Sequence, residues 1–165
     1  MKVYVASAYD TALKAGKSKR YVRELAFQAM IQAVNHFPEN CSLFSPVAMT
    51  LDMQNIFNNK SRDEMMRICL DRLNGCDALF IPNLSYTLSS EEIRQEYKFA
   101  TNNNKKIVFE NHIFQEIFDQ DLAEDYCLQD LRDSIKRQDE NIKETMKKVI
   151  VLFDKINQLC EGVKS

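Results

Sequence analysis

The sequence is poor in residues that interrupt regular structure, and it lacks any segment suited to a membrane. It has no tryptophan and only three glycines and three prolines among 165 residues, which leaves little room for long irregular linkers. No apolar run approaches the roughly 20 residues that a membrane-spanning helix needs. The apolar segment near the N-terminus, Val3 to Ala6, is too short for the core of a signal peptide. We therefore expect a cytoplasmic protein with no membrane partner.

Charge, cysteines and histidines exclude further classes. A formal net charge of -2 gives no general electrostatic reason to bind a nucleic acid polymer. The five cysteines are odd in number and no two have C-x-x-C spacing, which is typical of reduced thiols rather than of a disulfide framework. The two histidines, His36 and His112, lie far apart in sequence and provide too few ligands for a metal. The sequence therefore predicts no metal site and no cofactor.

The sequence does contain the pattern of one α/β domain. Four short segments predict strands, at residues 2–9, 41–46, 78–81 and 106–110, and helical patterns separate them at residues 21–36, 62–73 and 89–100. The apolar runs are continuous in the first and third strands, which indicates strands that are buried on both faces and hence parallel. The alternation predicts an open parallel sheet of four to five strands with helices on both faces, a Rossmann- or flavodoxin-like α/β fold.

Local signals suggest where these elements begin and end. Residues 10–20 form a predicted basic loop. Ser89, with Glu92 three residues later, predicts a capping box at the start of a helix. Gly75 predicts a left-handed residue at the end of the preceding helix. Residues 47–60 fit either a loop or a loop with a helical turn.

The final third of the chain has a different character, because no convincing strand follows residue 110. A short amphipathic helix is predicted at residues 113–118, and the acidic stretch 119–133 is predicted to be helical in part. A seven-residue apolar recurrence then follows at Ile135, Ile142, Val149 and Ile156. Two interpretations remain open, a helix that packs on its own sheet and a helix of an intersubunit bundle. We therefore divide the chain into an α/β domain, residues 1–110, and a helical extension, residues 111–165.

Glu96 is the residue best suited to chemistry. It shares a helical face with Ile93, Tyr97 and Ala100, and a buried carboxylate is costly to ionise unless it is paired or hydrogen-bonded. The alternative is that Glu96 lies at the edge of this apolar stripe and reaches solvent. The loop that precedes its helix contains Asn83 and follows a predicted strand. In parallel sheets such loops face the ligand.

Three segments resemble, in order and spacing, the nucleoside 2-deoxyribosyltransferase-like superfamily. This superfamily includes 2'-deoxynucleoside 5'-monophosphate N-glycosidases and small uncharacterised bacterial and phage proteins. Residues 3–9, VYVASAY, are similar to its first-strand signature, and residues 76–81, CDALFI, are similar to its third strand. Residues 90–96, SEEIRQE, are similar to its S-x-G-x-x-x-E motif. The resemblance covers residues 2–110 and leaves the helical extension unexplained.

The resemblance implies an activity and two catalytic residues. Glu96 matches the nucleophile that attacks C1' of a nucleoside and displaces the base, to be resolved by water or by a second base. Tyr4 matches a first-strand tyrosine that orients this carboxylate. A plain aromatic core residue is the alternative interpretation of Tyr4. The family also implies a homo-oligomer, because its members often complete the site from a neighbouring subunit.

The resemblance further implies how a nucleoside or nucleotide would be held. Ser7 and the backbone around Ala8 match a loop that holds the sugar or phosphate. Ser90 matches a contact to a phosphate or sugar hydroxyl at a helix N-terminus, where free N–H groups favour an anion; its alternative role is a helix cap. Asn83 completes the predicted substrate-binding residues.

The sequence also departs from the family pattern. Glu92 stands where the motif has glycine, so it adds bulk and negative charge near a phosphate. Residues 83–90 contain none of the acidic residues that some transferases carry there, and Ala8 replaces the usual proline. Two functions therefore stay open. One is an N-glycosidase or deoxyribosyltransferase, and the other is a catalytically inactive nucleotide-binding or assembly module of the same fold.

Overall fold

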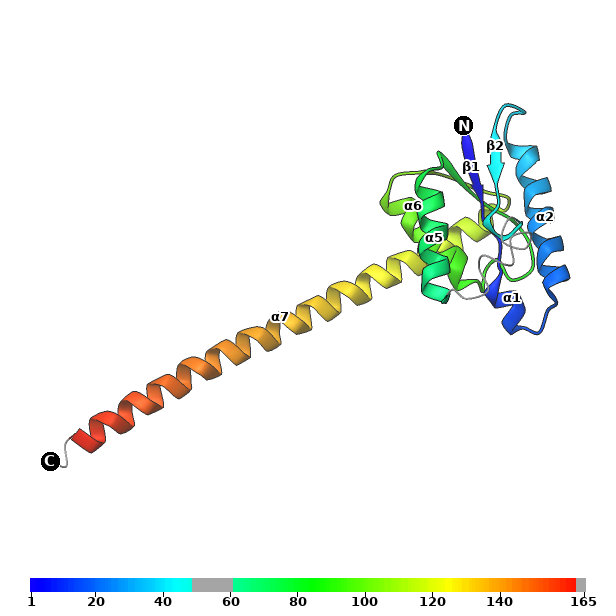
Figure 1. Ribbon diagram of the computed structural model, residues 1–165. Coiled ribbons are helices and arrows are strands. Elements are labelled where there is room, and N and C mark those ends of the chain that lie inside the picture. The colour runs from blue at the N-terminus through cyan, green and yellow to red at the C-terminus, as the bar shows by residue number, and fades with distance from the viewer. Residues whose placement is uncertain (49–60, 163–165) are drawn as a thin grey trace. The chain divides into compact units, whose positions relative to one another are not determined.

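The computed structural model describes the backbone of residues 1–48 and 61–162, and side chains as far as residue 148, with gaps from residue 128 onward (Figure 1). Its sheet has four parallel strands in the order β2-β1-β3-β4. They are β1 Lys2–Val5, β2 Ser42–Phe44, β3 Ala78–Ile81 and β4 Lys106–Phe109. The predicted parallel α/β fold is confirmed.

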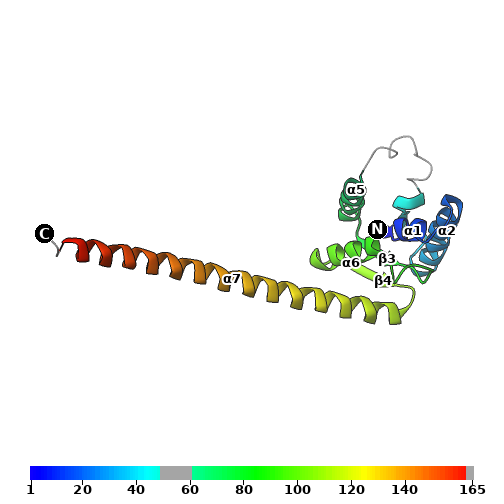
Figure 2. The same ribbon diagram turned by 90° about the horizontal axis from the view of Figure 1, so that it is seen from below.

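Helices cover both faces of this sheet (Figure 2). In chain order the described helices of the protein are α1 Asp10–Lys14, α2 Lys19–His36, α5 Arg62–Asn74, α6 Glu91–Asn102 and α7 His112–Gly162. Side chains alternate along β1, as they do in any strand. Val3 and Val5 pack against Ala29 and Ala33 of α2, whereas Tyr4 contacts Glu96 of α6 on the opposite face. This alternation brings a tyrosine of the central strand to the face that α6 covers.

The segment after β1 differs from its prediction. β1 ends at Val5, and α1 forms within the stretch that was predicted to be a loop. The reason is tertiary packing, because Ala12 on this short helix is buried against Val22 and Ala26 of α2. Gly16 then closes α1 with a positive φ of 77°, a conformation that glycine adopts without steric cost.

The helix boundaries include two corrections. Ser61 and Glu64 form a capping box at the start of α5. The prediction for Gly75 was wrong, because its φ is -79° and its N–H bonds to the Arg72 carbonyl in a tight final turn. The cap of α6 is Ser90 rather than Ser89, whose hydroxyl instead donates to the carbonyl of Tyr86.

α7 is one continuous helix, where the sequence predicted separate and partly helical pieces. Its first turns are anchored by Phe118, which is buried against the rings of Tyr97 and Phe109. The contacts within the chain divide it into two compact units, Met1–Gln120 and Asp121–Ser165. The side chains of the seven-residue recurrence lie outside the described residues, so both interpretations of it remain predictions. Among the helices that the structure describes, none is long and apolar enough to cross a bilayer.

Candidate functional site

Two residues 92 positions apart in sequence meet on the face of the sheet that α6 covers. The hydroxyl of Tyr4, in β1, donates to Oε1 of Glu96, in α6, over 2.5 Å. Tyr4 is 0% exposed and Glu96 is 3% exposed. Glu96 therefore does not reach solvent at the edge of its helix, which was the alternative that the sequence left open. The tyrosine and the carboxylate form one buried pair.

The environment of Glu96 strongly favours its protonated form. Burial raises the pKa of Glu96 to about 8; the hydrogen bond from Tyr4 opposes this rise, and the negative charge of Glu92 adds to it. Burial, followed by the charge of Glu96, also raises the pKa of Tyr4 well above its ordinary value. The phenol therefore stays a neutral donor over the whole range in which Glu96 titrates.

Two buried oxygens have no hydrogen-bond partner in the part of the chain that the structure describes. One is Oε2 of Glu96, the oxygen that Tyr4 does not hold, and the other is Oγ of Ser7. Ser7 lies just beyond the carboxyl end of β1 and is 7% exposed. A buried polar atom without a partner costs about 1–3 kcal/mol, so each such atom in a folded protein needs an explanation. A ligand that bonds to these oxygens would provide one.

Cys69, on α5, lies close to this pair, and its thiol and the hydroxyl of Tyr4 influence each other's ionisation. Burial, together with the nearby charge of Glu96, raises the pKa of Cys69 to about 12, so the thiol is neutral. The sequence analysis did not identify Cys69 as part of the site, because nothing local in the sequence relates α5 to β1.

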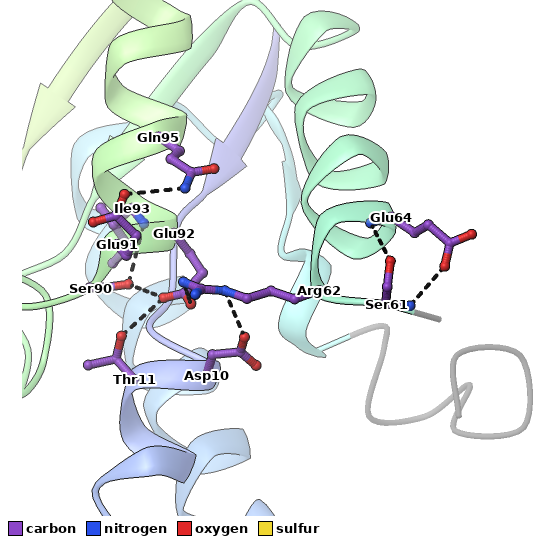
Figure 3. A network of polar contacts seen from close by, with 10 residues as sticks. All are labelled: Asp10, Thr11, Ser61, Arg62, Glu64, Ser90, Glu91, Glu92, Ile93 and Gln95. Carbon is purple, nitrogen blue, oxygen red and sulfur yellow. Dashed lines mark hydrogen bonds and ion pairs between the residues drawn. The ribbon is translucent and has the colours of Figure 1, made fainter. Parts of the chain in front are cut away.

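A second carboxylate, Glu92, lies one helical turn before Glu96 and anchors a polar network (Figure 3). Its Oε2 accepts hydrogen bonds from the hydroxyls of Ser90, at 2.8 Å, and Thr11, at 3.1 Å. Its Oε1 accepts from Nη2 of Arg62 at 3.1 Å. The same guanidinium approaches Oδ2 of Asp10 with Nε, at 3.3 Å. The network thus joins α1, α5 and α6 at the N-terminal end of α6.

These contacts hold Glu92 in its ionised form. Burial alone would raise its pKa, but hydrogen bonds from Ser90, its own backbone N–H and Thr11, with the charge of Arg62, outweigh burial and lower the pKa. Glu92 and Glu96 occupy positions i and i+4, which lie on one face of a helix. Their environments shift the two pKa values in opposite directions, so that Glu92 stays ionised while Glu96 favours its protonated form.

The other residues predicted to bind substrate differ in where they lie and in what they contact. Ser7 and Ala8 are buried beyond the end of β1. Ser90 caps α6 by accepting from the N–H of Ile93 at 3.3 Å, while its hydroxyl donates to Glu92. Asn83 lies in the loop after β3, where its backbone N–H and carbonyl pair with the side chain of Gln32 on α2. No contact found among the described residues joins Asn83 to the Tyr4–Glu96 pair.

The strand order explains why these loops matter. In the order β2-β1-β3-β4, the chain leaves β1 toward one side of the sheet and enters β3 on the other side. Open α/β sheets bind ligands beyond the carboxyl ends of the strands at such a switch point. Ser7 follows β1 and Asn83 follows β3, so both border this position. Among the described residues, no group of three or more metal-ligating side chains comes together.

Comparison with known protein families, with curated proteins and with solved structures found no significant match to this chain.

Proposed function

We propose that this protein cleaves the bond between base and sugar in a nucleoside or nucleotide, as an N-glycosidase or deoxyribosyltransferase with Glu96 as its nucleophile. The observation that carries this proposal is the buried Tyr4–Glu96 pair. One carboxylate oxygen is fixed by the phenol, and the other is buried and has no hydrogen-bond partner among the described residues. The resemblance of residues 2–110 to the nucleoside 2-deoxyribosyltransferase-like superfamily gives the pair its reaction class.

The reaction proceeds in two displacements. Oε2 of Glu96 attacks C1' of the sugar while the bond from C1' to the base nitrogen breaks, and its electron pair leaves with the base, which takes up a proton from solvent. Water or a second base then attacks C1' and breaks the ester bond, which restores the carboxylate and returns a proton to solvent. Tyr4 keeps Oε1 in place throughout, so that only Oε2 is presented to the sugar.

The attacking carboxylate must be ionised. With a pKa of about 8, roughly one Glu96 in ten carries its charge at pH 7. The transition state places positive charge on the sugar ring, beside this carboxylate. An opposite charge at close range favours the ionised form. In the free protein, therefore, only a small fraction of Glu96 is ionised. The positive charge that develops on the sugar then stabilises the ionised carboxylate as the bond to the base breaks.

The test is to incubate the protein at pH 8 with a panel of nucleosides and nucleotides and to measure the release of free base by chromatography. We expect the wild-type protein to release base from at least one member, and Glu96→Gln to be slower by about 10³-fold or more, as when other enzymes lose their nucleophile. Glu91→Gln is the matched control, because Glu91 is an exposed glutamate on the same helix. Equal rates for Glu96→Gln and the wild type would exclude Glu96 as nucleophile.

The second candidate function is a non-catalytic module that binds a nucleoside or nucleotide. The protonation of Glu96 favours it, because a neutral carboxyl group can bond to a ligand without attacking it. This function predicts thermal stabilisation by a ligand of the panel with no base released. The homo-oligomer that the resemblance implies remains a prediction for either function.

A further inference from the structure

The N-terminal end of α6 carries the kinds of donor that bind a phosphate. Hydroxyls and a guanidinium, placed where a helix has free N–H groups, form a typical anion site. Here Ser90 and Thr11 provide the hydroxyls and Arg62 provides the guanidinium. All three bond to the carboxylate of Glu92, which comes from the first turn of the same helix (Figure 3). An anion that belongs to the protein itself therefore occupies this end of the helix.

In the described part of the chain, the charges around Arg62 do not favour a second anion. Its guanidinium contacts Glu92 through Nη2 and Asp10 through Nε, at 3.1 and 3.3 Å. One positive charge thus faces two negative ones, and the described contacts of Glu92 include no other cationic side chain. The Glu92 side chain is only 15% exposed, so solvent screens its charge less than it would at the surface.

This network lies within electrostatic reach of the proposed nucleophile. Glu92 precedes Glu96 by one helical turn, and its charge raises the pKa of Glu96. A phosphate bound beside Glu96 at this end of the helix would meet the same charge. It could bind there only if the Glu92 side chain left all three of its partners.

We propose that Glu92 determines the substrate class of this site, by excluding phosphorylated substrates and admitting uncharged nucleosides. The inference rests on the proposed function, which leaves open whether the substrate carries a phosphate. Glu92 touches no reacting atom in this scheme. It acts by occupying the donors of Ser90, Thr11 and Arg62.

The test compares Glu92→Ala and Glu92→Gln with the wild type in two assays. Inorganic phosphate is titrated while thermal unfolding is followed, and base release from a nucleoside is compared with release from its 5'-monophosphate. Glu91→Ala is the control, because it removes the same charge from the same helical turn, from a side chain that accepts a hydrogen bond from Gln95 rather than from Ser90, Thr11 or Arg62. Glu92→Gln keeps the shape of the side chain if the alanine variant folds poorly.

We expect phosphate to raise the unfolding temperature of both Glu92 variants. It should not change the unfolding temperature of the wild type or of Glu91→Ala. The preference for nucleoside over monophosphate should fall by about tenfold or more in the Glu92 variants, because a repulsive charge is lost and three donors become available. A wild type that cleaves monophosphates as readily as nucleosides would overturn the inference. So would Glu92 variants that neither bind phosphate nor change preference. If no protein releases base from any substrate, the proposed function fails and the phosphate titration alone decides this inference.

Discussion

At pH 8, Glu96→Gln is expected to be more stable than the wild type, whereas at pH 5 the two proteins should differ little. Burial raises the pKa of Glu96 from an ordinary 4.5 to about 8. Between these values the unfolded chain releases a proton that the folded protein keeps, so wild-type stability falls as pH rises. Glutamine has no charge to desolvate, and its Oε1 can still accept the hydrogen bond from Tyr4. A neutral side chain at position 96 thus favours stability, whereas the proposed reaction needs an ionised carboxylate there.

The size of this effect follows from linkage. The stability difference between Glu96→Gln and the wild type should grow by roughly 3 kcal/mol from pH 5 to pH 8, since each unit of pKa difference corresponds to about 1.4 kcal/mol. Denaturant unfolding at several pH values measures it. Glu91→Gln, which alters an exposed side chain of the same helix, should show no such growth. Parallel curves for Glu96→Gln and the wild type would mean that Glu96 is not buried in its protonated form.

Tyr4→Phe is expected to shift the pH dependence of base release toward higher pH. The hydrogen bond from Tyr4 favours the ionised form of Glu96, so its loss raises the pKa of Glu96 further above 8. Each additional unit lowers the ionised fraction at pH 7 about tenfold. In the wild type, kcat/KM should rise with pH and level off above about 8, because this parameter reports ionisation in the free enzyme. In Tyr4→Phe the same rise should occur at a higher pH.

Tyr97→Phe is the control for this variant. Tyr97 follows Glu96 in the same helix, and its hydroxyl donates to Asp119 rather than to Glu96. Removing that hydroxyl should leave the pH profile of base release in place. If Tyr4→Phe lowers activity equally at every pH, the phenol positions the carboxylate without tuning its ionisation. An unchanged profile and rate would remove Tyr4 from the mechanism.

The sequence predicted the sheet and placed Glu96 on an apolar helical face for understandable reasons, whereas its pairing with Tyr4 was implied only by the family resemblance. The run from Ala78 to Ile81 is apolar at every position, which is typical of a strand covered on both faces, and all four residues are buried. The helical face that Glu96 shares with Ile93 and Tyr97 was visible from periodicity, and all three are buried. Periodicity cannot distinguish the centre of an apolar face from its edge. The burial of Glu96 follows from the structure, in which Tyr4 lies opposite it.

The sequence could not predict the Glu92 network, because its members come from three helices. Thr11 and Asp10 lie on α1, a helix whose existence depends on packing against α2. Arg62 reaches from α5, and its place beside Glu92 depends on how two helices pack. The family pattern marked Glu92 only as a departure from glycine. In the structure, the carboxylate of Glu92 binds the hydrogen-bond donors at the start of its own helix.

The most direct measurement for the central claim is the mass of the protein after incubation with a nucleoside that bears fluorine at C2'. Fluorine disfavours positive charge on the sugar ring, and so slows the hydrolysis of a glycosyl ester enough for it to be observed. We expect a mass increase equal to the fluorinated sugar, located by peptide mapping to Glu96 and absent from Glu96→Gln. Release of base from ordinary nucleosides with no adduct at Glu96, or with an adduct on another residue, would contradict the account.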